Sequence, residues 1–537
     1  MRPLQDIVEE LGIREEDVTY HGKWKAKLSL VAAPARGMGK LILVTGMTPT
    51  SHGEGKTVVS IGLAMGLSKL GRTAVASIRQ PSAGPVFGIK GGGAGGGAAT
   101  LEPMQDVNLG LTGDFAAVAA AHNLLSAVVE NHVFHGNVLR IDPNSIVWPR
   151  TVDVEDRSLR EVTVGLGERN GTPHGSKFII TAASEVMAIL CLAGGYADYK
   201  ARLERMIVGY DLGGKGVTAG QLGVVGAMAA LTRDALHPNL VQTAEGTPAL
   251  VHGGPFGNIA HGTSSLISII QALRLGEYAV VEAGFGSDLG GEKFVDIVAG
   301  PSGLKVDAAV IVATVRALKH HGGAENLEAP NPGAVESGLE NLSKHIENVR
   351  TLGMRPVVAV NRFASDRDEE LRLVYDFCRS EGVPSAVSSA YIEGGGGSLE
   401  LARLVVEEAG KGSSPRALYD SGLPVREKVE VVARKMYGAD GAAFTEAAEA
   451  DLRRVEGMGL SAEPVCIAKT SASLSDDPAK RGRPKGFVVT AHAVEVAAGA
   501  GFNVVSMGEI VRMPGLPRSP AAERVQVSDE GVISGVF

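Results

Sequence analysis

A segment near the N-terminus combines the residue types with which proteins bind nucleotide phosphates. An apolar run at residues 40–44 precedes the glycine-bearing segment 45–57, and apolar residues at helical spacing follow it. In a strand–loop–helix context, glycines let backbone N–H groups face phosphate oxygens. Lys56 can neutralise phosphate charge, and the Thr57 hydroxyl can ligate Mg²⁺. The segment therefore predicts a site for a nucleoside triphosphate with magnesium.

One position departs from the ordinary phosphate-binding loop, because Thr50 stands where glycine is usual. The alternative to a nucleotide site is a structural turn ahead of a helix. The strand before the loop and the helix after it favour the nucleotide site.

A second candidate is Arg79, which follows the predicted strand 73–78 and opens a glycine-rich stretch, residues 84–97. In a doubly wound sheet the carboxyl ends of adjacent strands flank one crevice, so Arg79 is expected to face the phosphate that Lys56 holds. A guanidinium there can bind a transferred phosphoryl or acyl-phosphate group through two hydrogen bonds. The alternative is an arginine that caps a surface turn.

The elements that must position these residues alternate between strands and helices. Apolar runs bounded by loop signals predict buried strands. These runs are residues 40–44, 73–78, 206–208, 278–283, 308–314, 356–361 and 466–469. The fold class expected is α/β, a mostly parallel doubly wound sheet of the P-loop NTPase type with additional smaller α/β domains. We expect a nucleotide-binding domain over residues 1–345 with a subdomain inserted at about 115–225, and a C-terminal α/β region of one or two subdomains over 346–537.

Bulk composition limits the partners. The 537 residues are 44% hydrophobic and carry a formal net charge of -8 without long runs of like charge, so neither nucleic acid nor a membrane surface is expected as a partner. No apolar stretch has the length of a signal peptide or a membrane span. Three widely separated cysteines indicate reduced core thiols. The chain is therefore expected in the cytoplasm, acting on small molecules.

Several blocks of sequence resemble formate–tetrahydrofolate ligases in order and spacing from about residue 20 to the C-terminus. The clearest are TPTSHGEGKT (48–57), RQPSAGPVFGIKGGGAGGG (79–97), TGD (112–114), HGGPFGNIAHG (252–262), EAGFGSDLGGEKF (282–294) and VATVRALKHHGG (312–323). Members of that family join formate to tetrahydrofolate with Mg-ATP, through formyl phosphate. The resemblance also implies a homotetramer and a response to a monovalent cation, K⁺ or NH4⁺.

Residue by residue, the resemblance implies an ATP site formed by Thr50, Ser51, His52, Gly53, Glu54, Gly55, Lys56 and Thr57. It implies that Arg79 and Lys56 hold formyl phosphate. Asp114 lies in the family's active-site region, where it could orient the acceptor amine or a magnesium-bound water. The alternative for Asp114 is a helix N-cap, because a helix is expected to begin near Phe115.

The family stacks its pterin between two aromatic side chains, which the resemblance places at Phe363 and Tyr391. Tyrosine stands here for the usual tryptophan, and the acidic Glu393 and Gly396 stand for the usual lysine and glutamate. Stacking survives these changes, but a reversed charge alters how an anionic tail is received.

These and other departures leave open a related acyl-phosphate ligase with a different pterin or carboxylate, or a weakly active nucleotide-binding paralogue. The histidines at 252, 261, 320 and 321 lack the spacing of a metal site and are expected to be satisfied by backbone groups.

Overall fold

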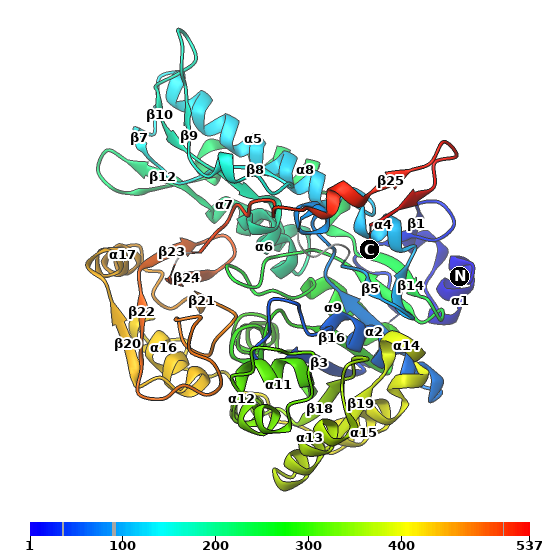
Figure 1. Ribbon diagram of the computed structural model, residues 1–537. Helices are drawn as coiled ribbons and strands as arrows, with labels where there is room; N and C mark the ends of the chain where they lie inside the picture. The colour runs from blue at the N-terminus through cyan, green and yellow to red at the C-terminus, as the bar shows by residue number, and fades with distance from the viewer. Residues whose placement is uncertain (35–36, 89–92, 509, 537) are drawn as a thin grey trace.

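A large mixed β-sheet forms the centre of the chain (Figure 1). The computed structural model describes residues 1–34, 37–88, 93–508 and 510–536. Seven neighbouring strands of the sheet run parallel. In spatial order they are β15 (Pro248–Val251), β4 (Ala74–Ile78), β16 (Tyr278–Glu282), β3 (Lys40–Gly46), β17 (Val306–Ala313), β18 (Pro356–Asn361) and β19 (Ser385–Ser388).

The far edge beyond β15 is antiparallel. There β14 (Asn239–Thr243) pairs with β15, β2 and β6. This edge comprises β1 (Val18–Tyr20), β2 (Ala26–Leu28), β5 (Gly95–Gly96) and β6 (Ala99–Glu102), and α1 (Leu4–Leu11) precedes it in the chain. The expectation of an α/β protein with a mostly parallel sheet is confirmed.

Helices cover both faces of the parallel strands, because successive side chains of a strand point to opposite faces. Leu41 and Leu43 of β3 share a buried cluster with residues of α9 and α12, whereas Ile42 and Val44 share the other with residues of α2 and α15. The helices of this region are α2 (Lys56–Lys69), α9 (Leu266–Leu275), α10 (Gly300–Ser302), α11 (Val315–His321), α12 (Pro332–Thr351), α13 (Asp368–Ser380), α14 (Ala390–Glu393) and α15 (Leu399–Gly410).

Helix α2 is buried on nearly all sides, since every residue from Val59 to Leu67 is shielded from solvent. Its two glycines make this possible. A Cβ on Gly62 would lie 2.3 Å from the Cβ of Ala390, and one on Gly66 would lie 3.0 Å from the carbonyl oxygen of Ser398. The close approach holds the helix of the predicted phosphate loop against α14, which carries Tyr391.

An inserted segment leaves the sheet after short helices α3 (Ala83–Phe87) and α4 (Met104–Asn108) and returns at β14 (Figure 1). It contains α5 (Asp114–Phe134), α6 (Glu185–Leu192), α7 (Tyr196–Arg205), α8 (Val225–Leu231), β7 (Ile141–Ile146), β8 (Arg150–Val152), β9 (Val162–Val164), β10 (His174–Ser176), β11 (Phe178–Ile180), β12 (Ile207–Asp211) and β13 (Gly216–Thr218). Its strands form small sheets of their own, so the strand expected at 206–208 exists as β12 but pairs with β7 and β13.

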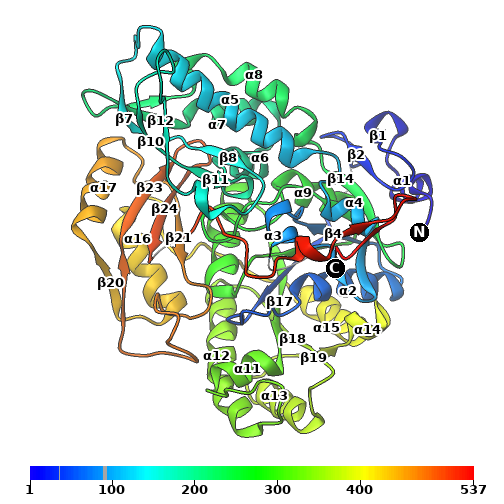
Figure 2. The ribbon, with the colours of Figure 1, turned by 45° about the horizontal axis from the view of Figure 1, so that its top comes forward.

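The C-terminal part likewise builds separate small sheets. Its elements are α16 (Val425–Val432), α17 (Glu446–Gly457), β20 (Gly441–Phe444), β21 (Val465–Lys469), β22 (Val488–Ala491), β23 (Ala493–Ala497), β24 (Phe502–Met507), β25 (Gln526–Val527) and β26 (Ile533–Ser534). The strand expected at 466–469 is β21, which pairs with β24 rather than with the large sheet. The final segment runs back towards the N-terminal region (Figure 2), where Gln105 Nε2 donates to the carbonyl oxygen of Ile533 at 2.7 Å.

The boundary expected after residue 345 falls inside α12, and β18 and β19 continue the large sheet beyond it. The strands of the separate C-terminal sheets begin after the loop at residues 411–415. Among the described residues, no helix combines the length and apolar content that crossing a membrane requires.

Candidate active site

The predicted phosphate loop connects β3 to α2 at the carboxyl edge of the parallel strands. Gly53 and Gly55 have φ values of 75° and 72°, a backbone conformation that favours glycine. Glu54 is buried, and its carboxylate accepts hydrogen bonds from the Thr50 N–H at 2.6 Å and the Thr50 hydroxyl at 2.8 Å. The threonine that replaces the usual glycine is therefore held from inside the loop by a carboxylate.

Arg79 and Thr57 meet at one carboxylate, that of Glu282. The Thr57 hydroxyl donates to Glu282 Oε2 at 2.8 Å, and Arg79 Nε lies 3.6 Å from Oε1. Arg79 also donates to the carbonyl oxygen of Pro255 at 3.3 Å. The strands that precede Lys56 and Arg79 were expected to be adjacent. They are β3 and β4, and β16, which ends in Glu282, runs between them.

Glu282 was missed by the sequence analysis as a site residue. It is 5% exposed and is the last residue of the buried strand β16, at the carboxyl edge of the sheet where ligands of α/β proteins bind. An acidic residue in that position was the available signal. Since a carboxylate and a threonine hydroxyl are both ligands that Mg²⁺ accepts, Thr57 and Glu282 fit a magnesium ion at the phosphates.

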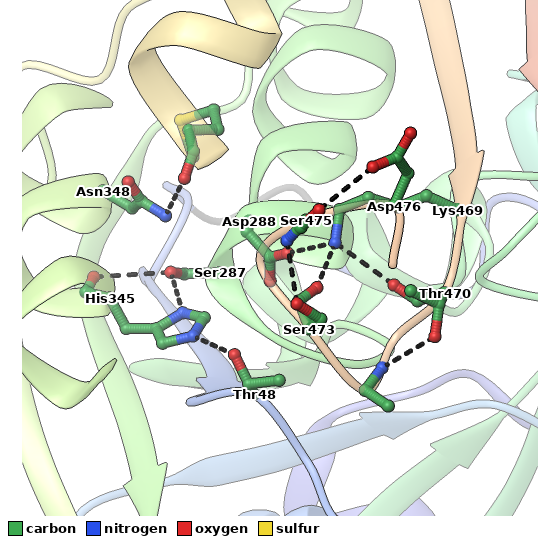
Figure 3. Close-up of polar contacts among 12 residues, drawn as sticks. Thr48, Ser287, Asp288, His345, Asn348, Lys469, Thr470, Ser473, Ser475 and Asp476 are labelled. Atoms are coloured by element: carbon green, nitrogen blue, oxygen red, sulfur yellow. Dashed lines mark hydrogen bonds and ion pairs between the residues drawn. The ribbon is translucent and has the colours of Figure 1, made fainter. Parts of the chain in front are cut away.

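A buried polar network supports the start of the loop (Figure 3). Thr48 Oγ1 lies 2.9 Å from His345 Nε2, and the Ser287 hydroxyl lies 2.8 Å from His345 Nδ1. Burial lowers the pKa of His345 to about 4, so its ring is neutral. Next to Ser287, Asp288 forms an ion pair of 3.0 Å with Lys469, and both side chains are at most 4% exposed. The C-terminal strand β21 is thereby tied to the segment that follows Glu282.

Asp114 begins α5 and is fully engaged in a buried network. Its Oδ1 lies 2.7 Å from Lys27 Nζ, and its Oδ2 accepts from Asn239 Nδ2 at 2.7 Å. The N-cap of α5 is Gly113, and Asp114 is the first helical residue. The alternative that Asp114 is the N-cap is therefore wrong. These contacts describe a positioning role, and a catalytic role for Asp114 stays a prediction.

The two aromatic residues expected to stack on the pterin follow neighbouring strands. Phe363 comes two residues after β18 and Tyr391 three residues after β19, and Asn361 pairs with Ser388 across these strands. The Tyr391 side chain is 57% exposed. A Cβ on Gly96 would lie 3.2 Å from its ring, so Tyr391 lies beside the glycine-rich stretch, of which residues 89–92 fall outside the described residues.

Two cavities among the described residues differ in size and in the elements that line them. The smaller, about 450 Å³, is lined by His52, Arg316 and residues 325–328, and so places the outer part of the loop at a pocket. The larger, about 970 Å³, lies between the inserted segment and the C-terminal sheets, and its lining includes none of Lys56, Arg79, Phe363 or Tyr391.

The histidines set aside in the sequence behave differently from one another. His252 contacts the carbonyl oxygen of Ala235 at 2.7 Å, a backbone partner as expected, and also the side-chain Ser265 Oγ at 2.6 Å. His261 is buried, and neither ring nitrogen has a hydrogen-bond partner. Within the described part of the chain, no group of three or more His, Cys, Asp or Glu side chains is arranged to hold a metal ion. The three cysteines are free and buried, which confirms reduced core thiols.

The fold and this loop define an α/β protein whose candidate site lies at the carboxyl edge of a mostly parallel sheet. The family model for formate–tetrahydrofolate ligases matches residues 1–537, the whole chain. The chain belongs to the formate–tetrahydrofolate ligase family. Enzymes of this family ligate formate to tetrahydrofolate at the expense of ATP. Because the match covers residues 1–537, it confirms over the full length the resemblance seen in the short blocks.

Proposed function

We propose that the chain forms 10-formyltetrahydrofolate from formate, tetrahydrofolate and ATP through formyl phosphate. A formate oxygen attacks the γ-phosphorus and ADP leaves. The acceptor amine of tetrahydrofolate then attacks the formyl carbon, phosphate leaves, and the amine loses its proton. Phosphorylation supplies the leaving group that formate lacks. The observation that carries the proposal is the full-length family match on a chain that keeps Lys56, Thr57 and Arg79.

Each site residue has a role in this scheme. The loop from Thr50 to Thr57, of P-loop type, binds the ATP phosphates, and Lys56 and Arg79 neutralise the charge of formyl phosphate. Thr57 and Glu282 hold Mg²⁺, which supplies charge neutralisation at the phosphates when bound. Phe363 and Tyr391 stack on the pterin ring.

The family match does not favour a ligase for another acid or acceptor. A homotetramer, a cytoplasmic location and activation by K⁺ or NH4⁺ belong to the proposal as well. Light scattering of the purified chain tests the homotetramer. Activity assays in K⁺, in NH4⁺ and in neither test the activation by a monovalent cation.

The test is a coupled assay of purified protein with Mg-ATP, formate and tetrahydrofolate that follows the folate product and ADP together. We expect both to form in equal amounts, and both to disappear in Lys56→Ala. The matched control is Lys69→Ala at the other end of α2, where Lys69 is 44% exposed and pairs with Glu245 at 3.2 Å. ADP that forms at the same rate without formate, or a Lys56→Ala variant as active as the control, would overturn the proposal.

A further inference from the structure

One arginine contacts both the phosphate loop and the first of the two pterin aromatics. Arg316 lies in α11, one turn after the end of β17. Its Nη2 donates to the carbonyl oxygen of Gly53 at 2.9 Å, and its guanidinium carbon lies 4.5 Å from the centroid of the Phe363 ring. A cation at this distance is attracted by the negative face of the ring. The same planar group therefore joins the Gly53 carbonyl of the predicted phosphate loop to an aromatic side chain.

A second contact joins the next peptide of the phosphate loop to the end of β18, two residues before Phe363. Asn361, the last residue of β18, donates from Nδ2 to the carbonyl oxygen of Glu54 at 3.0 Å. The fit is tight, because a Cβ on Gly55 would lie 2.4 Å from that nitrogen. The backbone at 53–55 therefore contacts both the arginine that lies over Phe363 and the strand end that precedes Phe363.

Helix α11 is itself anchored to the loop. Thr314 caps the helix by accepting the Ala317 N–H at 3.0 Å, and its hydroxyl donates to the Glu54 carboxylate. The buried Nε of Arg316 has no hydrogen-bond partner. The guanidinium is therefore oriented by the Gly53 carbonyl and the Phe363 ring, and not by a competing side chain on the Nε side.

We propose that Arg316 is a positioning residue that couples nucleotide binding to pterin binding. Phosphates that order the loop hold the Gly53 carbonyl in place, this carbonyl holds the guanidinium, and the guanidinium covers one face of Phe363 so that the other face is presented to a pterin ring. The coupling rests on the proposed function, since it needs both ligands. Because coupling free energies are reciprocal, the pterin strengthens nucleotide binding by the same factor.

Calorimetric titration of the full chain tests this coupling without turnover. The dissociation constant of tetrahydrofolate is measured with and without saturating Mg-ADP. In the unmodified protein we expect it to fall by roughly tenfold when ADP is bound, within the usual range of coupling between sites. In Arg316→Gln the factor falls to below twofold, while the affinity for each ligand alone changes less. Phe363→Leu removes the same factor, and adding it to Arg316→Gln changes the factor no further.

The neighbouring arginine provides the control. Arg362 precedes Phe363 but pairs with the exposed Asp368 at 3.4 Å, so Arg362→Gln keeps the tenfold factor. Arg316→Lys keeps a donor for the Gly53 carbonyl but loses the planar guanidinium, so we expect a smaller coupling factor between ADP and tetrahydrofolate. If Arg316→Gln does not fold, Arg316→Lys tests the coupling in its place. Undiminished coupling in Arg316→Gln, or no coupling in the unmodified protein, overturns the inference alone. A folded unmodified protein that binds ADP and not tetrahydrofolate overturns the proposed function as well.

Discussion

Lys27 Nζ lies 2.7 Å from Asp114 Oδ1, and both side chains are only 4% exposed. The pair joins β2 at the edge of the large sheet to the start of α5, the first helix of the inserted segment. Burial lowers the pKa of Lys27, and the Asp114 carboxylate opposes this change. The amide of Asn239 donates to the second oxygen of Asp114 at 2.7 Å, so the carboxylate is satisfied on both sides.

Asp114→Asn is expected to lower the free energy of unfolding by about 3–5 kcal/mol, because it leaves a buried ammonium without its counter-charge. Urea unfolding followed by circular dichroism measures the loss. In the double variant Lys27→Met, Asp114→Asn the orphaned charge is gone and most of the stability returns. The rate of formate-dependent ADP formation by this double variant then separates the two roles. A rate within a few-fold of that of the unmodified protein means that Asp114 positions α5. No ADP formation means that Asp114 is catalytic.

Glu282→Gln is expected to raise the Mg²⁺ concentration for half-maximal activity by about 10–100-fold, the usual cost of losing a carboxylate near a metal. The carboxylate accepts from Thr57 at 2.8 Å, and its loss removes negative charge where the cation would bind. Magnesium titrations at saturating ATP give the constant. Glu277→Gln is the matched control, since Glu277 lies just before the other end of β16 in an exposed pair with Arg72. Equal magnesium constants for the two variants would contradict the assignment.

Glu185 is expected to make the contact between the inserted segment and the C-terminal sheets depend on pH. Burial raises its pKa from 4.5 to about 7, although Oε1 accepts from the N–H groups of Gly499 at 2.8 Å and Ala500 at 3.2 Å. The folded protein binds the Glu185 proton more tightly than the unfolded chain does, and this difference stabilises the fold. The contribution to the free energy of unfolding is complete below pH 4.5 and is lost as the pH rises through 7. The loss is at most about 1.4 kcal/mol per pH unit.

Urea midpoints and hydrogen exchange of the peptide that contains Gly499, at pH 5 and pH 7.5, measure this effect. Glu185→Gln keeps an acceptor oxygen without the titration, so its stability changes less over that range than the stability of the unmodified protein. Parallel pH dependence of the two proteins would show that other groups govern the change.

Glu393→Lys is expected to improve binding of folates with anionic tails, because it reverses a charge on α14 beside Tyr391. An exposed charge acts weakly, so we expect about a threefold gain for a triglutamate folate at low salt and none at high salt. Dissociation constants for the mono- and triglutamate forms give the comparison. Glu446→Lys, on α17, carries the same change in net charge and should leave the ratio unaltered. A gain that persists at high salt, or appears in Glu446→Lys, would argue against the charge explanation.

Local pattern was enough to find the framework of the site. The apolar runs at 40–44, 278–283 and 356–361 became β3, β16 and β18, because buried parallel strands are apolar on both faces and read as unbroken runs. The phosphate loop and the helix after it were also predicted from residue types that are close together in the sequence. Periodicity does not distinguish which sheet a strand joins, so β12 and β21 were recognised as strands without an assigned sheet.

The sequence by itself determined the family, the α/β class and the loop that we propose binds the phosphates, since these depend on residue types a few positions apart. Only the tertiary structure decided that Glu282 lies between Thr57 and Arg79, that Asp114 is paired with Lys27, and that Arg316 connects Gly53 to Phe363. Each of these contacts joins residues separated by some 50 to more than 260 positions. The contacts of Glu282 and Arg316 exist because the strand order brings the carboxyl ends of β4, β16, β3, β17 and β18 side by side, and spacing along the chain carries no record of that order.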